Sequence, residues 1–121
     1  MIHPPIDSFR VAAARRSPHH RLSHALTQRL GRMLRLVDSR ETPWASATFT
    51  GARHRFHFVV EDVPMGTAER GRITALAEAE WGLHGHVVAD VALRWGYTEP
   101  QAGHDPIMLN VEMLTVADAA A

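Results

Sequence analysis

The sequence HVVADVALRW occupies residues 86–95, and the sequence PIMLNVEMLTV occupies residues 106–116. In both stretches apolar residues recur at every second position, which is the period of a strand with one buried face. The intervening stretch of about ten residues contains glycine and proline and predicts a connecting loop. We therefore expect an antiparallel hairpin whose core face is formed by the odd-numbered residues Val87, Ala89, Val91, Leu93 and Trp95, followed by Ile107, Leu109, Val111 and Met113.

The charges of this hairpin favour one register. In the tightest register Asp90 would lie directly opposite Glu112, and like charges that face each other destabilise a strand pair. A loop that is longer by one residue on each side places Val91 opposite Met113 and Arg94 diagonal to Glu112, and it keeps the apolar residues on one face. We expect this second register, with Arg94 and Glu112 close together on the side away from the helices.

Two helices are predicted from apolar residues spaced three and four apart. Ser17 followed by Pro18 is a typical helix start, because the serine caps free amides and the proline has no amide to satisfy. The first helix is expected from Pro18 to about Asp38, and the second from about Thr67 to Trp81. The apolar side of the first helix consists of Leu22, Leu26, Leu30, Met33, Leu34 and Val37.

Residues 44–62 change from the helical period to a period of two. Apolar and polar residues alternate on both sides of Gly51, which interrupts the pattern. This arrangement predicts a second β-hairpin that turns at Gly51–Arg53.

The predicted order of elements is α-β-β-α-β-β. Alternating strands with segregated helices indicate the α+β class, here a four-stranded antiparallel sheet with two helices on one face. Residues 1–16 are interpreted as a flexible or partner-docked arm, and residues 17–121 as a single domain. Such a small sheet has two free edges and one uncovered face, and a homodimer is a common way to bury them.

The composition excludes several classes of protein. The chain has 121 residues and no cysteine, so disulfides, thiolate nucleophiles and thiolate metal sites are excluded. We find no apolar run long enough to span a membrane and no secretory signal, and we expect a cytoplasmic protein without a membrane partner. All 13 basic residues are arginine, which we interpret as the codon preference of a bacterial genome.

The net charge is zero, but the charges are segregated along the chain. Residues 1–35 contain seven arginines and one acid, whereas residues 36–121 contain six arginines and twelve acids. A basic N-terminal segment is compatible with an anionic partner and equally with the acidic part of the same chain or of a second copy. Nucleic acid is the less favoured partner, because the basic helix offers few arginines on one face and the net charge is neutral.

Nine histidines are the most unusual feature of the composition. His20 and His24 are four residues apart on the first helix, but the neighbouring arginines oppose a cation there. The candidate ligand-binding residues are those in and beside the hairpins, where His84 and His86 would project to one side of an extended backbone. A third ligand could come from His57, Asp90 or His104. The four candidates are His54, His57, His84 and His86.

The sequence contains no nucleotide-binding glycine motif, no serine-hydrolase motif and no metalloprotease motif. We therefore expect no cofactor and assign neither catalytic nor metal-ligating residues. The preferred interpretation is a self-associating binding or interaction module, for which a small-molecule ligand is possible. The alternative is a small enzyme or metal-dependent ligand binder that uses the hairpin histidines. Nucleic-acid binding through the basic N-terminal helix is the third interpretation.

Overall fold

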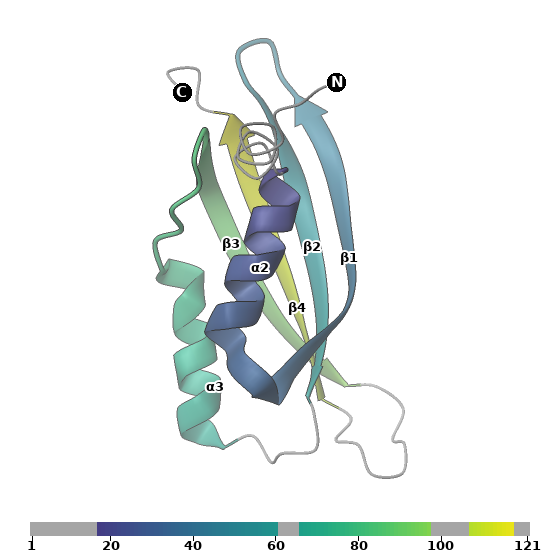
Figure 1. Cartoon of the computed structure of the whole chain (residues 1–121), viewed down its shortest axis with the longest axis vertical. Helices are drawn as coiled ribbons and strands as arrows, with labels where there is room; N and C mark the ends of the chain where they lie inside the picture. The colour runs from purple at the N-terminus through teal and green to yellow at the C-terminus, as the bar shows by residue number, and fades with distance from the viewer. Residues whose placement is uncertain (1–16, 61–65, 98–106, 118–121) are drawn as a thin grey trace, which may run out of the picture.

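The computed structural model describes residues 17–60, 66–97 and 107–117. Its elements follow the predicted order of helix, hairpin, helix, hairpin (Figure 1). Their bounds are α2 (Pro18–Leu30), β1 (Leu34–Ala45), β2 (Thr50–Val60), α3 (Thr67–Thr74), β3 (His86–Tyr97) and β4 (Ile107–Ala117). The predicted arm, residues 1–16, and His104 lie outside the described residues.

The four strands form one antiparallel sheet in the order β1-β2-β4-β3, so β2 and β4 pair in the centre and join the two hairpins. Both helices lie on the same side of this sheet (Figure 1) and contribute buried residues to one core. The predicted α+β fold class is therefore confirmed. Within the described ranges, no helix combines the length and the apolar character needed to cross a bilayer.

Helix α2 begins at the predicted position but ends earlier than expected. The side-chain oxygen of Ser17 accepts a hydrogen bond from a backbone N–H of the first turn, at 3.1 Å. The helix ends at Leu30 because Gly31 adopts the left-handed conformation, with φ of 73°, and its N–H donates to the carbonyl of Thr27. The prediction of a helix as far as Asp38 was wrong.

A 3-10 turn, Gly31–Met33, leads directly into β1. Leu34 is buried in the strand, whereas Val37 is 42% exposed at an irregularity in the pairing with β2. The helical spacing of these apolar residues was therefore coincidental. Pro43, which has no N–H to donate, is accommodated because β1 is an edge strand, where half of the N–H groups need no partner in the sheet.

The first hairpin turns at Ser46–Phe49, not at Gly51–Arg53 as predicted. The hydroxyl of Ser46 accepts hydrogen bonds from two turn amides. The backbone N–H of Ser46 donates to the carbonyl of Phe49 at 2.7 Å. Gly51 lies inside β2, where a Cβ atom would overlap the carbonyl oxygen of Thr115. This glycine is thus required by a close approach of two strands.

The second helix is also shorter than predicted. Helix α3 continues as a 3-10 turn to Glu78, and Trp81 follows in the segment that leads to β3. Ile73 is buried, and both Leu76 and Trp81 pack against the core.

The register of the last hairpin is confirmed: Val91 pairs with Met113, and Ala92 pairs with Glu112. An irregularity between Val88 and Asp90 changes the face of the residues before it. Val88 therefore packs against the core, and the predicted core residues at the start of the strand are exposed.

One detail of that prediction was wrong. Glu112 does lie on the face away from the helices, but its ion pairs are with β2 and not with Arg94. Its carboxylate oxygens lie 3.1 Å from Arg53 and 3.4 Å from Arg55. Glu112 therefore links the two central strands.

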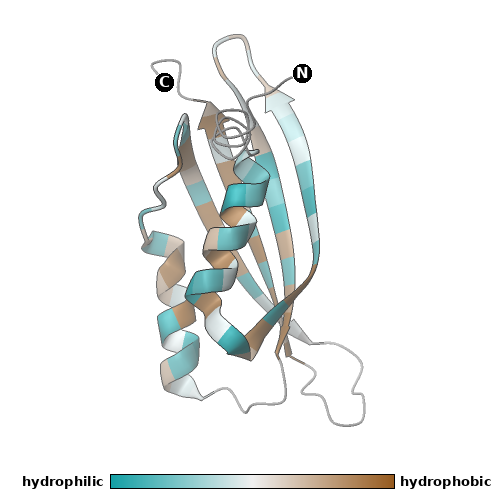
Figure 2. Ribbon diagram, viewed as in Figure 1, coloured by the Kyte–Doolittle hydropathy of each residue, from teal (hydrophilic) through white to brown (hydrophobic). Residues whose placement is uncertain are grey.

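The core lies between the helices and the inward faces of β2 and β4 (Figure 2). Each large apolar side chain buried in it stabilises the fold by roughly 1.5–3 kcal/mol relative to exposure. Two polar residues, His54 and Thr115, are fully buried at one end of this layer. The core cluster consists of Leu22, Leu26, Leu30, Leu34, Phe56, Phe58, Val60, Ile73, Leu109, Val111 and Met113.

Candidate functional site

The structure does not bring the four candidate histidines together. His54 points into the core, whereas His57, three residues along the same strand, lies in a groove on the opposite face of the sheet. His84 is exposed and His86 is partly buried, and Gly85 between them has φ of 81°, so this backbone is not extended as the prediction assumed. The described residues contain no group of three or more potential metal ligands in a suitable arrangement.

A histidine that sequence analysis had not selected, His19 in the first turn of α2, joins His54 in a chain of side-chain contacts. The two Nδ1 atoms are 3.0 Å apart, and His19 Nε2 lies 3.0 Å from the hydroxyl of Ser39 on β1. At the buried end, His54 Nε2 lies 2.8 Å from the hydroxyl of Thr115, which donates to the carbonyl of Ala52. This histidine chain connects the start of α2 to three strands.

The positions of the protons in the histidine chain follow from its last bond. Because Thr115 donates its hydroxyl proton to a carbonyl, it must accept a hydrogen bond from His54 Nε2–H. A neutral His54 then accepts at Nδ1 from His19 Nδ1–H, and His19 accepts at Nε2 from the hydroxyl of Ser39. With neutral imidazoles, this is the one assignment that satisfies all four contacts.

Burial favours the neutral form of both imidazoles. Burial lowers the pKa of His54 from 6.5 to about 4, and the positive charges that His19 and His86 can carry oppose protonation further. Burial also lowers the pKa of His19, although Glu41 acts in the opposite direction. The ring of His19 stacks on Phe56 with a centroid distance of 4.9 Å, which fixes its plane.

A second candidate site is a groove of about 620 Å³ on the sheet face that no helix covers. Strand pairing arranges its residues in two rows across the sheet. In one row His57 lies between Asp38 and Asn110, and its Nδ1–H donates to the side-chain oxygen of Asn110 at 2.7 Å. The first row consists of Asp38, His57, Asn110 and Arg94. The second row consists of Arg40, Arg55, Glu112 and Ala92.

The groove has an excess of positive charge, with three arginines and two carboxylates in its lining. Arg40 pairs directly with Arg55 across strands β1 and β2, and both side chains are exposed. Arg55 has Glu112 as an ion partner, but within the described part of the chain no ion pair of Arg40 is present. Two like charges are therefore neighbours at this position, and Glu112 balances only that of Arg55, so an anion beside Arg40 would be favourable.

The uncovered face ends in an apolar patch beyond the groove. The pairing aligns Trp44, Gly51, Val116 and Val87 across the four strands, and Val87 is 53% exposed. The ring of Trp44 lies close over Gly51, which has no side chain. We call Trp44, Val116 and Val87 the apolar end of the sheet.

The arginines of α2 are partly used inside the protein. Arg21 donates to the carbonyl of His84 at 3.1 Å, and Arg29 donates to the carbonyl of Glu80 at 3.2 Å. The guanidinium of Arg29 also lies 4.1 Å from the ring centre of Trp81. These contacts hold the segment before β3 against α2, so both arginines have a structural role.

His19 and Ser39 are not distinguished by any pattern in the sequence. His19 is far from His54 in the sequence, and no spacing rule connects a first helical turn with a central strand. Ser39 follows directly after the predicted end of the first helix, in a stretch that the structure shows as a strand.

Comparison of the chain with protein-family models, with curated proteins and with solved structures found no match.

The histidine chain makes the stability of the fold dependent on pH. Between pH 6.5 and about 4 the unfolded chain protonates His54, whereas the folded protein keeps it neutral. The free energy of unfolding should therefore decrease as the pH falls through this window, and the lowered pKa of His19 acts in the same direction. Urea unfolding measured at pH 7.5, 6 and 5 tests this.

The His54→Gln variant should be less stable than the wild type at pH 7.5 and should lose less stability between pH 7.5 and pH 5. His24→Gln, at an exposed position of α2, is the matched control and should retain the wild-type dependence. If both variants lost the same stability between pH 7.5 and pH 5, or if the wild type were more stable at pH 5, the assignment of a neutral His54 would be contradicted.

Proposed function

We propose that this protein is a binding module whose groove on the uncovered sheet face takes a small molecule with an anionic group. The observation that carries the proposal is the direct pairing of Arg40 with Arg55 inside the groove. A carboxylate or phosphate beside the two guanidinium groups would accept charge-assisted hydrogen bonds from both and would balance the charge of Arg40.

Other groups in the groove favour a ligand that is polar beyond its anionic group. Because His57 donates through Nδ1 to Asn110, its Nε2 atom remains for a further hydrogen bond. Arg94 lies at the far end of the same row and adds a third positive charge, and Asp38 lies at the near end. The groove volume of about 620 Å³ is within the usual range for small-molecule sites, about 300–1,000 Å³.

The proposal can be tested by titrating the labelled protein with inorganic phosphate and, separately, with citrate, at constant ionic strength. Backbone amide signals of Arg40, Arg55, His57 and Asn110 should shift in a saturable way. The relative strength of the two anions then distinguishes phosphate from carboxylate recognition. The Arg40→Ala variant should weaken binding of the preferred anion about tenfold or more, since it removes one of the two facing charges.

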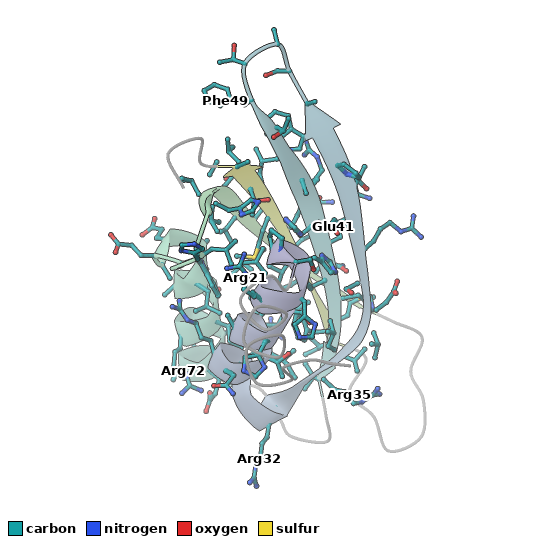
Figure 3. All side chains as sticks on the ribbon, turned by 45° about the horizontal axis from the view of Figure 1, so that its top comes forward. Arg21, Arg32, Arg35, Glu41, Phe49 and Arg72 are labelled. Atoms are coloured by element: carbon teal, nitrogen blue, oxygen red, sulfur yellow. The ribbon has the colours of Figure 1, made fainter. Side chains whose placement is uncertain are left out.

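Arg72→Ala is the matched control, because Arg72 is an exposed arginine of α3 outside the groove (Figure 3). It should bind the anions as the wild type does. Shifts that concentrate on the helices, or equal weakening by both arginine variants, would show that the anions respond to net charge and not to the groove.

A second candidate function is self-association through the apolar end of the same face. Val87 is 53% exposed beside Val116, and contact with a second copy of the patch would remove both side chains from water. A two-fold axis through this patch would place each apolar end against its equivalent.

Sedimentation velocity at protein concentrations of about 5–200 µM, chosen to span the micromolar affinities of weak dimers, tests self-association. The wild type should show a concentration-dependent dimer, and Val87→Glu should remain monomeric because a charge on the patch would have to be buried. Thr42→Glu, at an exposed position of the edge strand β1, is the control. A monomeric wild type throughout this range would rule out the candidate.

A further inference from the structure

The exposed end of the histidine chain has the arrangement of an activated nucleophile. Ser39 lies on the helix side of β1, where the short helix α2 leaves the strand exposed. Its hydroxyl is 3.0 Å from Nε2 of His19, and Nδ1 of the same imidazole is 3.0 Å from Nδ1 of His54. A nucleophile, a base and a third group that orients the base are therefore in hydrogen-bond contact.

We propose that Ser39 is a nucleophile activated by His19, and that it reacts with carboxylic esters and with related acyl or phosphonyl compounds. Ser39 also lines the proposed groove, but its hydroxyl contacts His19 on the helix side of the sheet, so this activity does not rest on the proposed anion binding. His54 is a positioning residue, because it contacts His19 and not the reacting hydroxyl.

The proton assignment gives each group the required role. The hydroxyl of Ser39 donates to His19 Nε2, which is the direction that removal of its proton by a general base requires. His54 accepts the Nδ1–H of His19 and is itself held by Thr115 and by burial. Stacking on Phe56 fixes the ring plane, so the base cannot rotate away from the hydroxyl.

A carboxylate is available to stabilise the imidazolium that forms when His19 takes the proton. Glu41 follows Ser39 on the same side of β1 and pairs with His54 in the sheet. Figure 3 shows Glu41 on β1 at the level of the N-terminal end of α2. Its charge favours the protonated form of His19, whereas His20 and the burial of the ring oppose it. His54, which is neutral, contributes no charge.

The reaction with an ester proceeds in two balanced steps. In the first, the oxygen of Ser39 bonds to the carbonyl carbon, the ester C–O bond breaks, and the hydroxyl proton passes through His19 to the departing alcohol. In the second, water attacks the acyl-serine while His19 takes its proton and returns it to Ser39, which releases the carboxylic acid. The sum is the hydrolysis of an ester to an acid and an alcohol.

A fluorophosphonate probe tests the nucleophile directly in the full chain. The serine oxygen bonds to phosphorus, fluoride leaves, and the proton moves to His19, so the adduct is stable. Mass spectrometry should find one adduct per chain on the peptide that contains Ser39. The Ser39→Ala variant should lose it, whereas Ser23→Ala, a serine of α2, should retain it. His19→Gln should slow labelling about 100-fold or more, the usual contribution of a general base.

A second measurement uses the absence of cysteine from the chain. The Ser39→Cys variant carries one thiol beside an intact histidine chain, and Thr48→Cys, at an exposed turn position, provides an unperturbed thiol. Iodoacetamide alkylation of the Ser39→Cys variant should reach half of its maximal rate at a pH at least one unit lower than that of the Thr48→Cys variant, because His19 stabilises the thiolate. A further His54→Phe substitution should move this profile towards that of the control, which a purely structural role would not do.

Circular dichroism should be used to check that each variant is folded. If His19→Gln does not fold, the thiol experiment still tests the proposal. The proposal is supported if the probe labels Ser39 alone and if the Ser39→Cys thiol is alkylated at lower pH than the Thr48→Cys thiol. It is overturned if Ser39 remains unlabelled in the folded protein, if other serines react equally fast, or if the two thiol profiles coincide.

Discussion

The pairing of β2 with β4 is the constraint on which the rest of this structure depends. It joins the two hairpins into one sheet, and its register is set by contacts on both faces. On the uncovered face Glu112 binds Arg53 and Arg55, and on the helix face His54 binds Thr115. A slip by one residue would bury charge and expose the core, so these contacts reinforce the apolar pattern.

The alternation of side chains along β2 gives the two faces different chemistry. His54 lies in the core, where burial keeps its imidazole neutral and all of its nitrogen atoms have partners. Arg55 and His57 project from the opposite face into a groove with excess positive charge. One strand thus carries a buried hydrogen-bonding residue on one face and an exposed polar surface on the other. Only the thickness of a single sheet lies between the two sites.

Much of the fold could be predicted from local patterns, whereas the candidate sites could not. The last hairpin and its register followed from alternation and from charge repulsion between Asp90 and Glu112. The first helix was extended too far because Leu34 fits both a helical and an alternating pattern, and the left-handed Gly31 was overlooked. The contact between His19 and His54 depends on how a helix docks on a sheet, which no local pattern specifies.

The central claim is that the histidine chain is neutral and that its protons point in one direction, from Ser39 to Ala52. The most direct measurement is long-range proton–nitrogen NMR of the imidazole side chains at pH 7. It should show His19 protonated at Nδ1 and His54 protonated at Nε2, each with one proton. The reverse tautomers, or a doubly protonated imidazole at either position, would contradict the account.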